Sequence, residues 1–466
     1  CPLPASPYIC CEGVKCMFRC PPYPAVPLPP PQKTAANQSD TLSSYSRPVS
    51  SGTRSTPDTA SHNSSSFASP LFFEKHSTAG ENLHGRGMMD NTLLSFTTAV
   101  KISVVYLEGE KMIYIQNYIN EFDNVINTND FLIIIIANIK GKTIENDNYP
   151  DNSISAEFMT LNNFENIVET FRNIGFETTA YFDENDFIKE SIKNNYWKEY
   201  HKKIIVYNTA QNGTQIGRKS LIPAFCYQNG ITICGSNPYV VSLTRHKYHC
   251  DQLLNASGIN TPKSFFFLGN DRWYMEKKPE DNMKVLAKLN YEASSIGMTK
   301  DNLFRYNDNK IPFLNRLSEF YRQPLDVQEY IEGYELEVPC IRDKNTIEAA
   351  FPVGIEYKGS SILKDVALTY DIRMKKDYTH YSFRYINAEI SDSIEETAKL
   401  VMEYINIEGL GRVDFRVAPS GKYYVTDIAA HPGIGPASAF VYAFREYGYS
   451  FSDLLKMMFM LTLKKA

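Results

Sequence analysis

The sequence predicts a mixed α/β and α+β protein that is preceded by a disordered leader. Three observations support this fold class. The composition changes abruptly near residue 95, strand and helix signals alternate from about residue 98, and two strands near the C-terminus carry acidic side chains. At 466 residues, of which 43% are hydrophobic and 13% aromatic, the chain can hold two to four domains with substantial cores.

Residues 1–95 form the first predicted region, a low-complexity leader. Thirteen of the 25 prolines fall within the first 70 residues, and Ser/Thr-rich sequence follows them. Such a composition buries too little apolar surface to offset the entropy of ordering the chain. We therefore expect this region to be disordered, or to be foreign to the sequence that follows it.

Residues 96–240 are predicted to form an N-terminal α/β domain. Strand signals alternate with a helical repeat, which favours a mostly parallel sheet covered by helices. The expected strands are Val100–Leu107, Phe131–Ile139, Glu177–Phe182 and Lys203–Tyr207, and the expected helix is Phe164–Ile174.

Two further units are expected, at 241–330 and 331–466. The central unit begins with a helix and continues mainly as strands, and the C-terminal unit contains a helix, a hairpin and a final helix. The expected helices are Leu243–Ala256, Ile394–Ile405 and Phe451–Leu463, and the expected strands are Phe265–Leu268, Lys284–Leu289, Asp326–Tyr330 and Glu335–Ile341.

Charge and hydropathy narrow the range of partners. The net charge of −5 does not favour nucleic acid or anionic lipid. No apolar run reaches the roughly 18 residues that a membrane-spanning helix needs. We therefore expect small-molecule partners, neither nucleic acid nor membrane, and a cytoplasmic location.

The most informative motif is a pair of strands near the C-terminus. Arg412 and Asp414 alternate along one strand and share a face, because side chains of a strand repeat every two residues. Asp427 ends the next strand, and it comes alongside if the two segments pair as a hairpin. Two carboxylates and a guanidinium on one surface suit a magnesium-bound polyphosphate.

A second motif joins a lysine to a loop of small residues. Lys288 ends the strand Lys284–Leu289, and Ser294, Ser295 and Gly297 follow. The loop can donate backbone N–H and hydroxyl groups to phosphates, and the lysine adds a point charge. Taken alone, however, this motif is more typical of a solvated turn after an edge strand.

The order of the motifs is more specific than any one of them. From about residue 200 to 462 the chain resembles the ATP-grasp superfamily, and in particular the D-alanine–D-alanine ligase family. The resemblance implies an ATP-grasp fold in which ATP lies between two α+β units, behind an N-terminal parallel α/β (pre-ATP-grasp) domain. It rests on Lys247, Lys288, Ser294, Ser295, Gly297, Gln328, Glu335, Tyr370, Lys375, Arg412, Asp414, Asp427 and Gly433 in that order.

The resemblance also implies which residues hold ATP. Two lysines would bind the phosphates, a loop would cover them, one strand would read the adenine, and a glutamate would bind the ribose. The phosphate-binding lysines are Lys247 and Lys288, and the covering loop contains Ser294, Ser295 and Gly297. The adenine strand contains Gln328, Tyr330 and Ile331, and the ribose-binding glutamate is Glu335.

A second set of residues would carry out the reaction. The first substrate's carboxylate would attack the γ-phosphate to give an acyl phosphate, and an amine would then displace the phosphate. The implied catalytic residues are Arg412, Lys288, Ser295 and, from a lid loop, Tyr370 and Lys375; the implied magnesium ligands are Asp414 and Asp427; and the implied substrate contacts are Gly433 and Ser438.

The chain departs from the family at several positions. Relatives usually have a glutamate where this chain has Asp427 and an asparagine where it has Ala429. The aspartate is shorter and the alanine cannot bind a metal, so the sequence supports one magnesium ion and leaves the second site open. The segment Asn208–Arg218 lacks the usual His-Gly pair, so the sequence does not name the first substrate.

The function that the resemblance implies is an ATP-dependent carboxylate–amine ligase acting on amino acids or peptides. Two alternatives are a nucleotide-binding relative with weakened catalysis and an ATP-dependent small-molecule kinase. Ala429 favours the first alternative, whereas Lys288, Arg412, Asp414 and Glu335 oppose it. A homodimer is expected by analogy only.

Overall fold

The computed structural model describes residues 114–196 and 200–465. The predicted leader and the expected strand Val100–Leu107 lie outside these residues. Among the described helices, none is both long enough and apolar enough to cross a membrane.

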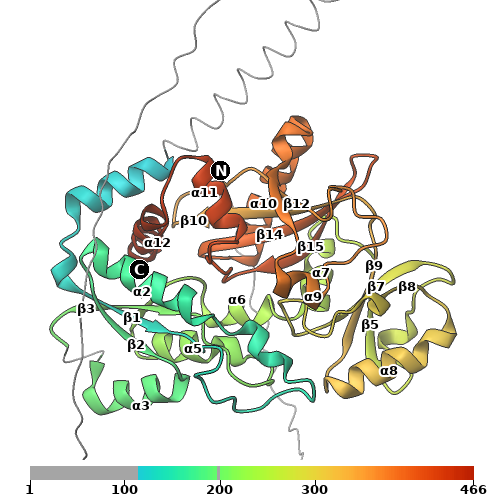
Figure 1. Cartoon of the computed structure of the whole chain (residues 1–466), viewed down its shortest axis with the longest axis horizontal. Helices are drawn as coiled ribbons and strands as arrows, with labels where there is room; N and C mark the ends of the chain where they lie inside the picture. The colour runs from blue at the N-terminus through green and yellow to red at the C-terminus, as the bar shows by residue number, and fades with distance from the viewer. Residues whose placement is uncertain (1–113, 197–199, 466) are drawn as a thin grey trace, which may run out of the picture. The chain divides into compact units, whose positions relative to one another are not determined.

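The N-terminal unit is built on a parallel sheet of four strands in the order β2-β1-β3-β4 (Figure 1). All six residues of β1 are buried, as expected for a parallel strand covered on both faces. The predicted α/β alternation is confirmed. Its elements are β1 (Phe131–Ile136), α2 (Leu161–Ile174), β2 (Glu177–Tyr181), α3 (Glu184–Asn194), β3 (Lys203–Asn208), α5 (Leu221–Gln228) and β4 (Thr232–Ile233).

The central unit holds an antiparallel sheet of five strands in the order β6-β5-β9-β7-β8. Helices α7 and α8 pack against β5, and the enclosed core includes Phe267, Val285 and Leu325. The elements are α7 (Lys247–Ala256), β5 (Ser264–Gly269), β6 (Arg272–Trp273), β7 (Lys284–Leu289), β8 (Leu303–Arg305), α8 (Ile311–Phe320) and β9 (Leu325–Glu329).

The single helix expected over Leu243–Ala256 is wrong, because the structure divides this segment. Helix α6 (Pro238–Leu243) ends before Thr244, and α7 begins at Lys247. His246 has a non-helical backbone, and its ring nitrogen accepts the N–H of His249 at 3.2 Å, which caps the new helix. The break makes Lys247 the first residue of α7.

The C-terminal unit contains a sheet of six strands in the order β13-β12-β10-β14-β15, with β11 also paired to β10. Helix α10 packs against β10, β11 and β14. The elements are β10 (Tyr334–Arg342), β11 (Ile347–Ala349), β12 (Val353–Glu356), α9 (Tyr370–Lys375), β13 (Thr379–Ser382), α10 (Ala388–Ile405), β14 (Gly409–Val417), β15 (Tyr423–Ala429), α11 (Ala439–Glu446) and α12 (Phe451–Lys465).

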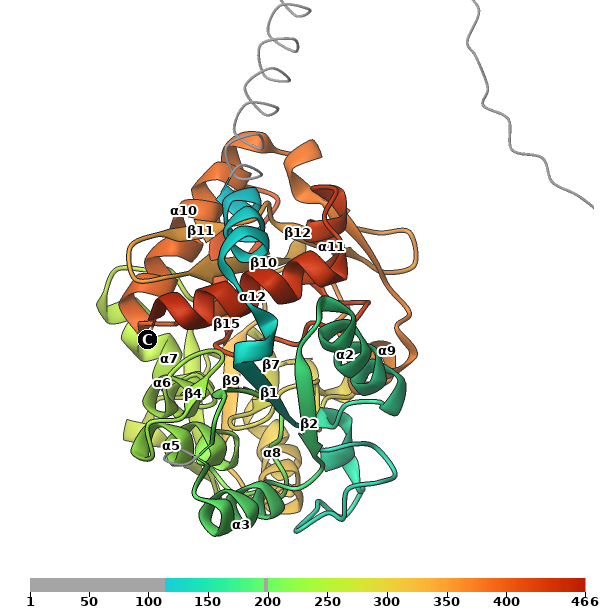
Figure 2. The same ribbon diagram turned by 90° about the vertical axis from the view of Figure 1, so that its left-hand side faces the viewer.

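The last helix, α12, returns to the N-terminal unit. It contacts α2 and β14, and Figure 2 shows it crossing in front of the C-terminal sheet beside the N-terminal strands. The ring of Phe459 packs against Phe131 and Phe176, with centroids 4.9 and 4.8 Å away. The N-terminal strands and the C-terminal sheet therefore share one core, which fixes the ends of β3, β14 and β15 relative to one another.

Candidate active site

A cavity of about 460 Å³ is lined by residues from the ends of β3, β7 and β15 and from the middle of β14. Residues from all three units line it. Of the residues predicted to act, those on its wall are Lys247, Lys288, Ser294, Ser295, Arg412, Asp414, Asp427 and Gly433. The others are not among its lining residues; they are Gly297, Gln328, Tyr330, Ile331, Glu335, Tyr370, Lys375 and Ser438.

The hairpin expected from the sequence is present. β14 and β15 are antiparallel, and Asp414 is directly opposite Asp427. Arg412 donates from Nε and a terminal nitrogen to the two oxygens of Asp414, at 2.7 and 2.8 Å. Burial raises the pKa of Asp414 to about 6, although Arg412 acts in the opposite direction. The hairpin therefore places two carboxylates and a guanidinium side by side at the cavity.

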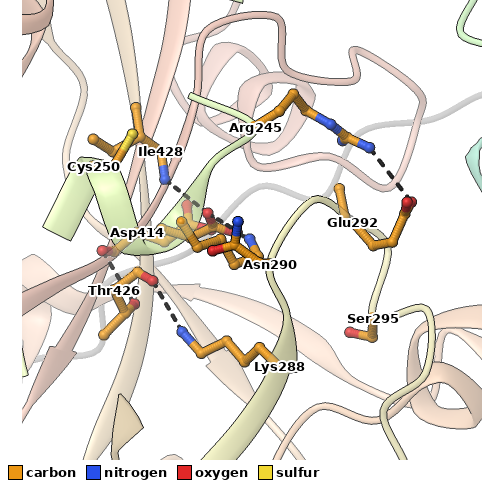
Figure 3. A network of polar contacts seen from close by, with 12 residues as sticks. Arg245, Cys250, Lys288, Asn290, Glu292, Ser295, Asp414, Thr426 and Ile428 are labelled. Carbon is orange, nitrogen blue, oxygen red and sulfur yellow. Dashed lines mark hydrogen bonds and ion pairs between the residues drawn. The ribbon is translucent and has the colours of Figure 1, made fainter. Parts of the chain in front are cut away.

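The two predicted phosphate-binding lysines also reach this place. Lys247 Nζ donates to both oxygens of Asp427, at 2.9 and 2.8 Å. Lys288 Nζ donates to Gln328 Oε1 at 2.7 Å and to the backbone oxygen of Thr426 at 3.2 Å, and Figure 3 shows the second contact. Both hydrogen-bond acceptors are neutral, and against the effect of burial the charge of Lys288 acts to lower the pKa values of the nearby Asp326 and Asp427 carboxyls.

The loop after β7 has a strained backbone. Ser294 and Ser295 both have positive φ, at 53° and 55°, which is uncommon for residues with a side chain and is often found at functional loops. At Gly297, with φ of 74°, a Cβ would lie 2.7 Å from a methyl carbon of Leu289, so only glycine fits there. The Ser295 hydroxyl donates to the backbone oxygen of Leu368 at 2.7 Å, which ties this loop to the segment before α9.

Two of the residues expected around the adenine and ribose, Tyr330 and Glu335, contact other residues of the protein. The Arg416 guanidinium lies 4.4 Å from the ring centroid of Tyr330, whose hydroxyl donates to Val366 O at 2.6 Å. Glu335 lies 3.5 Å from Arg416 and 3.7 Å from Arg373. The side chains of Tyr330 and Glu335 are therefore held by contacts within the protein.

Helix α9 offers a different residue to the cavity from the two that the sequence suggested. Arg373 lies on the cavity wall, whereas Tyr370 and Lys375 do not. Arg373 donates to Glu337 at 3.0 Å, and Glu337 also lies 3.8 Å from Arg412. Despite its burial, these cations lower the pKa of Glu337 to about 2. Glu337 is opposite Asp414 in the sheet.

Sequence reasoning missed this arginine and glutamate, although signals for both existed. Glu337 lies two residues after Glu335 and therefore shares its strand face. Arg373 lies three residues after Tyr370 on a short helix, where the side chains share a face.

A further set of missed residues joins the loop to the N-terminal unit. Glu292 accepts from Arg218 at 3.2 and 2.7 Å and lies 3.6 Å from Arg245, and Figure 3 shows the contact with Arg245. Glu157 lies 3.4 Å from Arg245 and accepts the N–H of Ala293 at 2.8 Å. We call Glu157, Arg218, Arg245 and Glu292 the charged belt. Its members are distant in sequence, so no local pattern could have revealed it.

Ser438, a predicted substrate contact, and the nearby His431 both have structural contacts. The Ser438 hydroxyl accepts the N–H of Val441 at 3.3 Å and so caps α11. The ring of His431 packs near Gly235 and Tyr207, and burial lowers its pKa to about 3. These contacts favour a structural role for His431.

The donors of the cavity fit one magnesium ion better than two. Asp414 and Asp427 are opposite each other, whereas Ala429, opposite Arg412, has no side-chain donor. Within the described residues, no group of three or more His, Cys, Asp or Glu could hold a metal ion. Magnesium is commonly bound by one or two carboxylates together with substrate phosphates. The pair therefore fits an ion that enters with a nucleotide.

Comparisons with known proteins agree with this geometry. The family model described as "D-ala D-ala ligase C-terminus" matches residues 253–460. The D-alanine–D-alanine ligase of Lactococcus lactis subsp. cremoris (strain SK11) is 22% identical over 267 residues, which cover 55% of this chain and 71% of that protein. The D-alanine–D-alanine ligase of Borrelia garinii subsp. bavariensis is 26% identical over 226 residues, which cover 46% of this chain and 60% of that protein.

Solved structures show the same fold. D-alanine–D-alanine ligase from Bacillus anthracis, in complex with ATP, is 15% identical with a TM-score of 0.53, and the match covers 71% of this chain and 97% of that one. The VanG D-Ala:D-Ser ligase from Enterococcus faecalis is 17% identical with a TM-score of 0.51, and the match covers 72% and 99%. The fold class expected from the sequence and the family resemblance are both confirmed. The chain is therefore similar in sequence and in fold to D-alanine–D-alanine ligases, and residues 253–460 match the family model of their C-terminal part.

Proposed function

We propose that this chain is an ATP-dependent carboxylate–amine ligase that joins amino acids or peptides through an acyl phosphate. The observation that carries the proposal is the meeting of Lys288, Arg412, Asp414 and Asp427 on one cavity wall, within a chain whose relatives are named as C–N ligases. Neither a relative with weakened catalysis nor a small-molecule kinase is favoured by these comparisons.

We assign the nucleotide phosphates to the side of the cavity formed by the central unit. Lys288 lines that side together with Ala293, Ser294 and Ser295 of the following loop, and its two hydrogen-bond acceptors are neutral. Lys247 neutralises Asp427 in this structure, and a polyphosphate would offer the lysine a second anionic partner. The adenine and ribose roles of Gln328, Tyr330, Ile331 and Glu335, and the role of Gly297 in the loop, remain predictions.

Arg412 is the residue best placed to stabilise the transferring phosphoryl group. Its guanidinium is fixed by two hydrogen bonds to Asp414, and it lies on the cavity wall between the acids and the N-terminal unit. A preoriented cation that needs no reorganisation during the reaction can lower the barrier by several kcal/mol. The catalytic roles of Ser295, Tyr370 and Lys375 also remain predictions.

Magnesium would be held by Asp414 and Asp427, and when bound it supplies positive charge to phosphate oxygens. The two carboxylates are preorganised by the hairpin register, and each is already balanced by a basic side chain. One ion is therefore the stoichiometry that we propose, without the second site of the family.

The substrates are proposed by analogy. Relatives are named for D-alanine and for D-alanine with D-serine, so small amino acids of either hand are the first to test. Gly433 lies on the cavity wall, and we propose that it and Ser438 approach the acceptor. Units bounded at 240 and 330, a homodimer and a cytoplasmic location belong to the same proposal.

The test is ADP release in the presence of ATP, magnesium and single or paired amino acids, followed by mass analysis of the product. We expect one amino acid or pair to stimulate ADP release and to give an amide with the mass of the two substrates less one water. Tight ATP binding with no stimulation by any amino acid or dipeptide would refute the ligase.

A further inference from the structure

The N-terminal wall of the cavity carries one lysine that the proposed function does not use. Lys219 lies between β3 and α5, next to the charged belt, and it lines the cavity. The belt itself holds two arginines and two glutamates, paired at 2.7 to 3.6 Å, so its own charges balance. Glu157, which is paired with Arg245, is also near enough to Lys219 to raise its pKa, so Lys219 shares a carboxylate with the belt and has none of its own.

Lys219 has a weak partner only. Its Nζ donates to the backbone oxygen of His431 at 3.4 Å, and within residues 114–196 and 200–465 it forms no ion pair. Burial lowers the pKa of Lys219 to about 8, with Arg245 and Arg412 acting in the same direction against Glu157. The lysine is therefore a cation at neutral pH, and Glu157, which already pairs with Arg245, balances its charge only in part.

Two neighbouring side chains are also unsatisfied. Gln211 is only 6% exposed and lines the cavity, yet its Oε1 has no hydrogen-bond partner among the residues that the structure describes. Its Nε2 donates to the backbone oxygen of Glu157 at 3.3 Å, which fixes the amide orientation. Thr209 lines the same wall, and its buried hydroxyl has no hydrogen-bond partner in the described part of the chain. Buried polar groups are normally paired, so this wall lacks a polar ligand.

The unsatisfied groups match the two ends of an amino acid. A lysine ammonium and a threonine hydroxyl donate to a carboxylate, and an amide carbonyl accepts from an ammonium. All three groups come from the segment between β3 and α5, on the N-terminal unit. The lysines assigned to ATP come from β7 and α7 of the central unit. The two kinds of cation therefore face the cavity from different units.

We propose that Lys219 binds the reacting carboxylate of the first substrate, with Thr209 and Gln211 completing the subsite. The inference rests on the proposed ligase function and deepens it. Lys219 is close enough to Arg412 for each charge to affect the other, so a carboxylate between them would lie beside the arginine assigned to the phosphoryl group. This lysine orients the nucleophile, and Arg412 stabilises the group that the nucleophile attacks.

The experiment compares Lys219→Met and Lys219→Arg with the wild-type chain. Wild type is first screened for ADP release with glycine and with both enantiomers of alanine, serine and glutamate, and the best substrate is kept. Lys189→Met is the matched control. It is the same substitution, but Lys189 lies on α3 with 76% of its side chain exposed.

We expect Lys219→Met to raise the KM for that amino acid by roughly 10- to 100-fold, the range for a lost charge-assisted hydrogen bond. The KM for ATP should stay within about twofold, because the lysine is assigned to the other substrate. Lys219→Arg should recover part of the loss, and Lys189→Met should match wild type. If Lys219→Met does not fold, Lys219→Gln replaces it in the same comparison.

Three results would overturn the proposal. They are an unchanged KM for the amino acid, an equal rise in the KM for ATP, and a loss confined to glutamate, which would place the lysine at a side-chain carboxylate. A wild-type chain that releases no ADP with any amino acid would instead refute the ligase function, and the subsite would fall with it.

Discussion

Replacing Glu292 by glutamine should destabilise the protein far more than a surface substitution of the same kind. The Glu292 carboxylate accepts from Arg218 at 3.2 and 2.7 Å and from the Tyr149 hydroxyl at 2.6 Å. The side chains of Glu292 and Arg218 are only 1% and 6% exposed. Glutamine keeps one acceptor but removes the charge, which leaves Arg218 buried with less compensation.

Glu292→Gln should lower the free energy of unfolding by about 3 kcal/mol, the lower end of the range for breaking a buried ion pair. The matched control is Glu280→Gln, which breaks the 3.4 Å pair with Lys263, a pair with side chains that are 78% and 61% exposed. An exposed pair of this kind contributes at most about 1 kcal/mol.

Urea unfolding followed by circular dichroism measures both changes. Adding Arg218→Met to the Glu292→Gln variant should cost less than the sum of the two single changes, because the second removes the stranded charge. If Glu292→Gln and Glu280→Gln cost the same, or if the two single changes at Glu292 and Arg218 are additive, the buried belt does not stabilise the fold as argued.

Three further predictions concern the active site. Arg412→Ala should lower kcat by at least about 10³-fold while ATP still binds by calorimetry, because an arginine on a transferring phosphoryl group contributes on this scale; wild-type turnover would remove its role. The pKa of Lys219 is near 8, so its positive charge is lost above that pH and kcat/KM should fall as the pH rises through about 8. Lys219→Arg should move this fall to higher pH. An unchanged pH profile in that variant would exclude Lys219 as the source of the fall. Ala429→Asn places a carboxamide opposite Arg412 and should lower the magnesium concentration needed for half-maximal ADP release; no change would mean that the chain lacks a second metal site.

Much of the fold could be read from local patterns. The continuous apolar run in β1 predicted a buried parallel strand, and the alternation of Arg412 and Asp414 predicted one strand face. Both depend on neighbours in sequence. The break between α6 and α7 was missed because it depends on the His246 ring accepting a backbone N–H, a contact that apolar periodicity does not encode.

The candidate site was predictable only in part, for the same reason. Residues with a fixed place in the motif order, such as Lys288 and Asp427, do lie on the cavity wall. The charged belt and Lys219 could not be found, because they come together only when the N-terminal unit packs against the loop after β7. The expected adenine residues follow the family order, yet Tyr330 is covered by Arg416 and by the segment near Val366.

The most direct test of the proposed ligase reaction is the product that this chain forms from ATP and amino acids. The account predicts that ADP, phosphate and an amide appear in equal amounts, and that the amide has the mass of the two substrates less one water. A stable phosphorylated amino acid, or ATP binding without amino-acid-dependent ADP release, would contradict it.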